Sequence, residues 1–359
     1  MVREHDLLRE LEALIARPSH RDPGPVLAYV QARLPFLPWQ RQRVGETATG
    51  RPLYNLYARP PQARAVLNTH VDTVPPLGMR RPWQARRVGR RIYGRGAVDT
   101  KGLLAALVVA ARAFWQQHRA LPAAIALTVD EENTSALGSA ALAPRLPRDL
   151  PVVVLEPTAG RICTRQRGAL EFRLTARGEV VHAAIAEQGV NPIRLLTAWL
   201  EGAEARLGMP VHVLQFRGGW PHYAVPPRAW LLAEMPLEAG HTWRAAEAAL
   251  LADLQRGPWA GRVTYTRIDA EDPLDFGEHP GVAWLRAAYR AALGQEPTPG
   301  VMPSWTDAAN FAQAGLHCVV FGFGDLAVAH SPREHITLDD LARMARVLYH
   351  FFSILTQKP

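Results

Sequence analysis

The chain has 359 residues, which is long enough for one large domain and a smaller one. With 48% hydrophobic and 21% charged residues, its composition is that of a soluble globular protein. The two cysteines, Cys163 and Cys318, lie far apart among apolar residues. This usage excludes a disulfide framework and indicates buried thiols in a reducing compartment.

The net charge of +8 raises the question of a polyanionic partner. Of the 41 basic residues only Lys101 and Lys358 are lysine, so the excess consists of 39 arginines. The densest arginine group has no aromatic stacking platform and no recognisable nucleic-acid-binding motif. We interpret this group as a solvated loop face and expect no nucleic-acid partner. It consists of Arg80, Arg81, Arg86, Arg87, Arg90 and Arg91.

The first twenty residues predict an amphipathic surface helix. Leu7, Leu11 and Leu14 recur at helical spacing among charged residues, which is unlike a signal peptide. The longest apolar stretch, residues 103–111, is too short to span a bilayer. We therefore expect a cytoplasmic protein without a membrane partner.

Short apolar segments that stop at polar residues alternate with helical stretches through the following part of the chain. This order is typical of an α/β fold with a mostly parallel central sheet and helices on both faces. The predicted strands are residues 53–59, 63–70, 123–130, 152–156 and 317–323, and the helices include residues 100–117, 135–142, 281–293 and 338–355.

A different pattern follows Cys163. It predicts a small α+β unit of four strands and two helices, formed by residues 164–274. This unit is inserted into a larger domain made of residues 1–163 and 275–359. Its predicted strands are residues 168–177, 211–216, 223–236 and 261–268, and its helices are residues 192–207 and 242–255.

Acidic and imidazole side chains stand where several of the predicted strands end. His70 closes one strand, Glu131 and Glu132 follow another directly, and Glu156 terminates a third. Asp99 lies in a glycine-rich loop just before a helix. Open α/β sheets bind their ligands at the carboxyl ends of strands. We therefore expect a functional site at this edge.

His70 and Asp72 are expected to act together. On an extended chain, residues two apart point to the same face. The Asp72 carboxylate can then accept a hydrogen bond from the second ring nitrogen of His70 and fix the ring for a metal. The alternative is that Asp72 caps a turn before Pro75.

Glu131 and Glu132 are neighbours, so on an extended segment they point in opposite directions. Both are therefore not expected to bind the same metal. One metal ligand and one general base is the simplest assignment, with the base taking a proton from metal-bound water. The spacing leaves open which residue has which role, and an exposed acidic turn is the alternative for the pair.

Asp99 and His330 complete the expected metal site. Asp99 resembles an ordinary helix N-cap, but its glycine-rich approach lets a short carboxylate bridge two cations. His330 supplies a second imidazole from the far end of the chain. Two divalent cations, one hydroxide and the carboxylates of Asp99, Glu132 and Glu156 form a neutral set. Nitrogen and oxygen ligands favour two Zn²⁺ per chain, with Co²⁺ or Mn²⁺ as substitutes.

Five segments carry a specific signal because they occur in a fixed order. They are residues 68–75 (NTHVDTVP), 93–102 (YGRGAVDTKG), 129–132 (VDEE), 156–158 (EPT) and 329–331 (AHS). An insert of the right size separates the fourth from the fifth. Over nearly the whole chain, this series resembles the di-zinc hydrolase family of aminoacylases, carboxypeptidase G, acetylornithine deacetylase and succinyl-diaminopimelate desuccinylase.

The resemblance implies a phosphorylase/hydrolase-like catalytic domain and a role for each residue of the site. Asp99 would bridge the two metals. His70 and Glu156 would bind the first metal, and Glu132 and His330 the second. Glu131 would be the general base, and Asp72 would orient the ring of His70.

The resemblance also implies that the inserted domain is a lid and a dimerisation module. His182 matches a family histidine that reaches into the partner subunit's site and stabilises the oxyanion. A homodimer is therefore expected. On the residues alone, His182 is an ordinary surface or core histidine.

Glu at position 156 resembles the acylases and carboxypeptidases of the family. Together with Gly322 and Gly324, it points to the acetylornithine deacetylase branch and to hydrolysis of an N-acyl amino acid. The expected mechanism uses a bridging water that two zinc ions and a glutamate activate. The alternatives are a dipeptidase or carboxypeptidase of the same family, and a non-enzymatic binding protein on this fold.

One departure concerns the substrate. In the family, an arginine of the lid binds the substrate carboxylate, and here Pro236 stands at that position. Proline cannot anchor a carboxylate. Arg228 is the nearby substitute, and Gly322 and Gly324 are the other expected substrate-binding residues.

Overall fold

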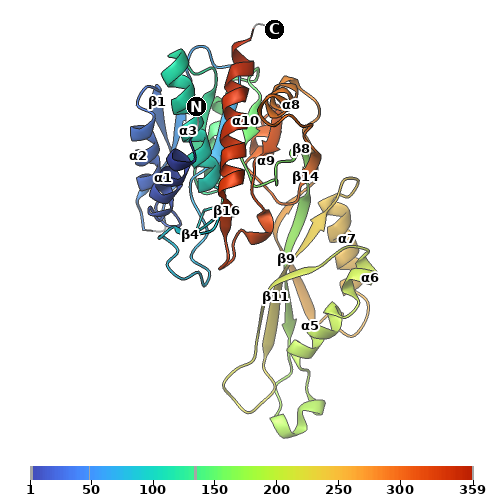
Figure 1. Ribbon diagram of the computed structural model, residues 1–359. Helices are drawn as coiled ribbons and strands as arrows, with labels where there is room; N and C mark the ends of the chain where they lie inside the picture. The colour runs from blue at the N-terminus through green and yellow to red at the C-terminus, as the bar shows by residue number, and fades with distance from the viewer. Residues whose placement is uncertain (1–2, 48, 133–135, 358–359) are drawn as a thin grey trace. The chain divides into compact units, whose positions relative to one another are not determined.

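The structure is a computed structural model that describes residues 3–47, 49–132 and 136–357 (Figure 1). The chain divides into two compact units. Unit 1 comprises Met1–Arg165, Asp275–Met302 and Thr306–Pro359. Unit 2 comprises Gln166–Leu274 and Pro303–Trp305.

Unit 1 is built on a sheet that has nine strands within the described residues. Its order is β1-β2-β6-β3-β7-β15-β8-β13, and β14 pairs with β8. The four central strands β6, β3, β7 and β15 are parallel, whereas β1, β2 and β8 pair in an antiparallel manner. The predicted α/β class is thereby confirmed. The strands are β1 (Trp39–Glu46), β2 (Pro52–Ala58), β3 (Val66–His70), β6 (Ala124–Thr128), β7 (Val152–Val154), β8 (Ile162–Gln166), β13 (Leu274–Asp275), β14 (Pro299–Met302) and β15 (Cys318–Phe321).

Alternation along the central strands explains how helices cover both faces of this sheet. Leu67 and Ile125 point into a core shared with helices α1, α3, α8 and α10. Other strand residues contact helices outside this core: Asn55 of β2 bonds the carbonyl of Gly138 in α4, and Thr128 of β6 bonds the residue before α9. The helices are α1 (Glu4–Ile15), α2 (Gly24–Arg33), α3 (Lys101–His118), α4 (Leu137–Leu142), α8 (Pro280–Leu293), α9 (Ala308–Gln313) and α10 (Leu338–Thr356).

A small three-stranded sheet, β16-β5-β4, joins the chain before α3 to the chain before α10. β4 is Arg86–Val88, β5 is Arg91–Tyr93 and β16 is His335–Thr337. Strands of three residues carry no periodic signal, so the sequence did not predict them.

Unit 2 contains an antiparallel sheet of order β10-β11-β9-β12. Alternate residues of β9 and β11, such as Phe172 and Leu231, are fully buried against helices α5 and α7. This arrangement is the predicted α+β insert. Its elements are β9 (Gly168–Arg177), α5 (Pro192–Leu200), α6 (Ala203–Leu207), β10 (His212–Gly218), β11 (Arg228–Leu237), α7 (Trp243–Leu254) and β12 (Val263–Glu271).

Two predicted elements of unit 2 have other bounds. The helix predicted over 192–207 is broken between α5 and α6, because Gly202 adopts a left-handed conformation with φ of 73°. The Arg206 guanidinium donates to the carbonyl of Trp199 across this break, a local contact that hydrophobic periodicity does not show. The strand predicted from 223 begins only at Arg228, after two prolines that have no N–H to donate.

Cys163 and Cys318 are both buried free thiols, in agreement with the prediction. In the described part of the chain, no helix has the length and apolar character needed to cross a bilayer.

Candidate metal centre

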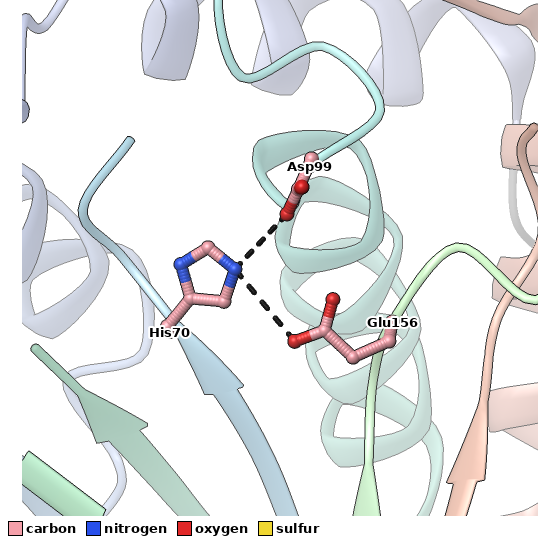
Figure 2. Close-up of side chains that lie close together, drawn as sticks. All are labelled: His70, Asp99 and Glu156. Carbon is pink, nitrogen blue, oxygen red and sulfur yellow. Dashed lines mark hydrogen bonds and ion pairs between the residues drawn. The ribbon is translucent and has the colours of Figure 1, made fainter. Parts of the chain in front are cut away.

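The first group of possible metal ligands is His70, Asp99 and Glu156. They come from the end of β3, the loop before α3 and the segment after β7, and Figure 2 shows them pointing toward one another. All three are buried, and their ligand atoms lie within 4.8 Å of one another. His70 Nε2 is 3.0 Å from Asp99 Oδ1 and 3.7 Å from Glu156 Oε1.

The second group is Asp99, Glu132 and His330, again within 4.8 Å. His330 Nε2 is 2.9 Å from Glu132 Oε2 and 3.3 Å from Asp99 Oδ2. Asp99 therefore turns one carboxylate oxygen to each group. This is the arrangement that a carboxylate bridging two cations requires.

The surroundings of His70 direct Nε2 toward the carboxylates. His70 Nδ1 is 3.2 Å from the backbone carbonyl oxygen of Asp72 and 3.7 Å from its Oδ1. The carbonyl is thus the closer partner, whereas the sequence predicted the carboxylate. A proton held on Nδ1 leaves the Nε2 lone pair for a metal. The Asp72 carboxylate instead accepts the backbone amide of Glu132 at 3.1 Å, which ties two ligand-bearing segments together.

Glu131 and Glu132 have different surroundings. Glu132 belongs to the second group, and its Oε1 accepts the amide of Val74 at 3.3 Å. Among the described residues, Glu131 belongs to neither group. Burial, followed by the charge of Glu156, raises the pKa of Glu131 well above its usual range. The geometry thus gives Glu131 and Glu132 different surroundings, a distinction that their spacing in the sequence could not make.

The cluster holds more buried negative charge than its own histidines offset. Burial raises the pKa of Glu156 well above its usual range and raises that of Glu132. Burial also opposes ionisation of Asp99, but hydrogen bonds from His330 and His70 lower its pKa. Hydrogen bonds to Asp99 and Glu132 raise the pKa of His330 to about 10. A divalent cation is the species that such a set of carboxylates favours.

One atom tests this fit directly. Among the described residues, the buried Glu156 Oε1 has no hydrogen-bond partner. Buried polar atoms are normally paired, so a buried carboxylate oxygen without a hydrogen-bond partner, beside an imidazole nitrogen, fits the role of a cation ligand. The donor set of nitrogen and oxygen atoms is one that Zn²⁺, Co²⁺ and Mn²⁺ accept.

Left-handed backbone conformations gather around the cluster. His330 has φ of 55°, Asp130, which precedes Glu131, has φ of 68°, and Ala159, after the Glu156 segment, has φ of 54°. Such conformations persist where surrounding contacts fix them, and they are common at functional sites.

His182 and Arg228 lie in unit 2, and both are exposed. His182 Nδ1 accepts the amide of Ala184 at 3.2 Å, so a neutral ring carries its proton on Nε2 as an N–H donor. Arg228 is the first residue of β11. Their expected roles in catalysis and substrate binding stay predictions.

Gly322 and Gly324 are buried beside the Glu156 segment. A Cβ on Gly322 would lie 2.4 Å from the backbone oxygen of Glu156, and Gly324 has φ of 110°. Both positions therefore require glycine for close packing. Substrate binding by these residues stays a prediction.

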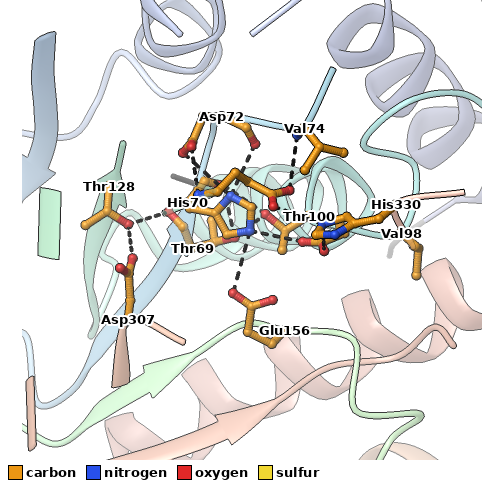
Figure 3. A network of polar contacts seen from close by, with 12 residues as sticks. Thr69, His70, Asp72, Val74, Val98, Thr100, Thr128, Glu156, Asp307 and His330 are labelled. Atoms are coloured by element: carbon orange, nitrogen blue, oxygen red, sulfur yellow. Dashed lines mark hydrogen bonds and ion pairs between the residues drawn. The ribbon is translucent and has the colours of Figure 1, made fainter. Parts of the chain in front are cut away.

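Asp307 is a buried residue of the site that the sequence did not reveal. Its Oδ2 accepts the Thr128 hydroxyl at 2.5 Å (Figure 3), and burial raises its pKa to about 6. It lies in the connection between β14 and α9. A single Asp before a six-residue helix forms no recognisable sequence motif. Only the fold brings Asp307 to the end of β6, where its charge acts on Glu156.

Comparison with known proteins agrees with this geometry. The model of "Peptidase family M20/M25/M40" matches residues 66–353. N-acetyl-L-citrulline deacetylase of Xanthomonas campestris pv. campestris is 28% identical over 94% of each chain. Succinyl-diaminopimelate desuccinylase of Methylocella silvestris is 29% identical over 82% of this chain and 83% of its own.

Solved structures show the same fold. Human carnosine dipeptidase 1 superposes with a TM-score of 0.78 at 17% identity, over 98% of this chain and 96% of its own. An M20 family metallo-carboxypeptidase from Sulfolobus solfataricus gives 0.73 at 19% identity, over 97% and 99%. The resemblance seen in the sequence is thus confirmed, and the chain belongs to peptidase family M20/M25/M40, as a metallohydrolase that acts on amide or peptide bonds.

Proposed function

We propose that this protein removes the acyl group from an N-acyl amino acid, with two divalent cations, preferably Zn²⁺, in the cluster. The observation that carries the proposal is Asp99, whose two oxygens each face a separate group of nitrogen and oxygen ligands. His70 and Glu156 would hold one cation, and Glu132 and His330 the other. When bound, the cations polarise the scissile carbonyl and acidify water.

Glu131 is the proposed general base. Its carboxyl is buried beside the cluster but belongs to neither ligand group of the described residues, and its raised pKa makes it a stronger base than an exposed glutamate. It accepts a proton from the attacking water and then delivers that proton to the leaving amine. The Asp72 carboxylate, by holding the Glu132 amide, keeps the ligand segment that follows Glu131 in place.

His182 is the proposed oxyanion donor, acting from the second subunit of a homodimer that unit 2 forms. The Nε2–H of the neutral ring is a suitable donor for the developing charge. Unit 2 would then act as a lid as well as a dimerisation module.

The substrate class rests on two relatives. Their names describe removal of an acetyl and of a succinyl group from an amino acid, and each alignment covers more than four fifths of both chains. N-acetylornithine is the first candidate and N-acetylcitrulline the second. Pro236 is paired to Ala169 inside the sheet of unit 2, so the substrate carboxylate needs another partner, for which Arg228 is proposed.

The test is a substrate panel on metal-free protein to which Zn²⁺, Co²⁺ or Mn²⁺ is returned. We expect release of acetate from N-acetylornithine or N-acetylcitrulline, two metal ions per chain, and loss of both metal and turnover in Asp99→Asn. Cleavage of dipeptides but of no N-acyl amino acid would replace the proposal with a dipeptidase or carboxypeptidase. Full metal content and activity in Asp99→Asn would refute the site.

A further inference from the structure

A buried ion pair joins the two ligand-bearing loops of the second metal group. Arg95 Nη1 bonds Glu334 Oε2, and both side chains are 1% exposed. Arg95 Nη2 also donates to the carbonyl of Pro76 at 2.8 Å. Arg95 lies four residues before Asp99, and Glu334 lies four residues after His330.

The second oxygen of Glu334 has a separate use. Glu334 Oε1 accepts the backbone amides of Val98 at 3.2 Å and Asp99 at 3.3 Å. An ion pair with Arg95 alone would not need these contacts. One carboxylate therefore holds a guanidinium with one oxygen and the peptide of the bridging ligand with the other.

The backbone of Glu334 is fixed to the same two segments. β16 pairs with β5, and the ladder continues as the Gly94 amide donates to the Glu334 carbonyl at 3.4 Å. In the other direction, the Glu334 amide bonds the carbonyl of Ser331 at 3.3 Å, which closes the turn that follows His330. Displacement of Glu334 would thus move the segments of Asp99 and His330 together.

We propose that Glu334 is a positioning residue for the metal centre, whose Oε1 fixes Asp99 for binding both cations while Arg95 holds its other oxygen. This inference rests on the two-metal site of the proposed function. Neither Glu334 nor Arg95 is proposed to touch the substrate. Removing a group that orients a metal ligand in this way typically lowers metal affinity or activity by about 10–100-fold.

Two double variants separate the amide contacts from the charge pair. Arg95→Met/Glu334→Gln removes both charges but keeps a side-chain oxygen for the two amides. Arg95→Met/Glu334→Leu removes both charges and that oxygen. Both variants remove the same two charges, including the charge of Glu334 that faces the buried Lys101. That loss is common to the two, so the difference between them reports the acceptor for the amides.

The measurement is the dissociation constant for Zn²⁺, by competition with a chromophoric chelator, together with thermal unfolding of the metal-free proteins. We expect the Leu variant to bind Zn²⁺ about 10–100-fold more weakly than the Gln variant. The matched control is the exposed pair Arg90–Asp339, which also joins the β5 region to the chain after β16. Arg90→Met/Asp339→Asn is expected to bind Zn²⁺ like the unmodified protein.

Equal affinity of the Gln and Leu variants would overturn the inference and leave a structural ion pair. If the Leu variant does not fold, Glu334→Asp keeps the charge but shortens the reach to the amides, and wild-type affinity in that variant would overturn it too. Failure of the unmodified protein to bind two ions would count against the proposed function itself, which distinguishes the two failures.

Discussion

At the scale of single residues, Glu131 and Glu132 show how neighbours acquire different chemistry. Glu132 is held by the Val74 amide, the Asp72 carboxylate and the His330 ring. Glu131 has no place in either ligand group formed by the described residues, yet its pKa is raised by burial and by Glu156. Glu132 is thus suited to holding a cation, and Glu131 to moving a proton.

We predict that Glu131→Gln keeps both metal ions but loses turnover by about 10²–10⁴-fold, the usual contribution of a general base. Glu132→Gln is the matched variant, with the same change one residue away, and it should lose metal. Metal content by mass spectrometry and kcat on the best substrate of the panel are the two readouts. If Glu131→Gln lost metal as well, Glu131 would be a ligand and not the base.

Metal binding should release protons. Hydrogen bonds to carboxylates raise the pKa of His330 to about 10, so its ring is protonated at neutral pH in the metal-free protein. A metal ligand must give up that proton, so affinity should weaken as pH falls below 10, by about tenfold per pH unit for each proton displaced.

Calorimetry of Zn²⁺ binding at pH 7 in buffers of different ionisation enthalpy measures this release. We expect at least one proton to leave per chain, and His330→Asn to lower that number. A heat of binding that is the same in every buffer would contradict the prediction.

At the scale of elements, the ends of strands and the glycines beside them set the ligand positions. Gly322 follows β15 and packs against the backbone of Glu156, where a Cβ would lie 2.4 Å from the carbonyl oxygen. Neither backbone can move without disturbing the parallel strands β7 and β15. The position of Glu156 therefore depends on residue 322 having no Cβ.

We predict that Gly322→Ala lowers the free energy of unfolding by about 1–3 kcal/mol, as overpacking does, and also weakens Zn²⁺ binding. The control is Gly315→Ala, at an exposed left-handed position with φ of 82° whose nearest side-chain atom is 3.9 Å from the added Cβ. That variant should lose about 1 kcal/mol through backbone strain but bind Zn²⁺ normally. Denaturant unfolding and chelator competition check both, and normal Zn²⁺ affinity in Gly322→Ala would show that Glu156 does not depend on this contact.

Element prediction was good where a pattern was long and poor where it was short. The apolar helix α3 and the alternating strand β9 lie close to their predicted ranges, because burial of many side chains fixes both. The strands β4, β5 and β16 were missed, since three residues show no period. The helix predicted over 192–207 was wrong as a single element, because Gly202 adopts a left-handed conformation and Arg206 bonds the carbonyl of Trp199 across the break.

At the scale of the whole molecule, the proposed function gives unit 2 two roles, dimerisation and the supply of His182 to catalysis. His182 is exposed in unit 2, and its proposed role requires a second copy of the chain. The homodimer stays a prediction.

Subunit mixing tests this role. Glu131→Gln and His182→Ala should each be nearly inactive while keeping their metals. If His182 acts across the dimer, mixed dimers regain one complete site, so an equal mixture with free exchange should reach about a quarter of full activity. Activity per chain after exchange is the measurement; full turnover of His182→Ala alone would refute the oxyanion role, and no recovery on mixing would refute action between subunits.

The sequence by itself determined the α/β class, the insert and the family. The first two depend on hydrophobic periodicity, and the family depends on short motifs that occur in a fixed order along the chain. It also named the residues that form both ligand groups, because His70, Glu132 and Glu156 follow strand ends, Asp99 precedes a helix, and His330 belongs to the ordered series of motifs that resembles the family. The spacing left the roles of Glu131 and Glu132 open, the family resemblance assigned them, and the geometry places Glu132 but not Glu131 in a ligand group of the described residues. Only the tertiary structure gave His70 the Asp72 carbonyl as its closer partner and revealed Asp307 and Glu334. Those outcomes depend on contacts between segments remote in the chain, such as Glu334 with Asp99, and no local pattern encodes which of them will meet.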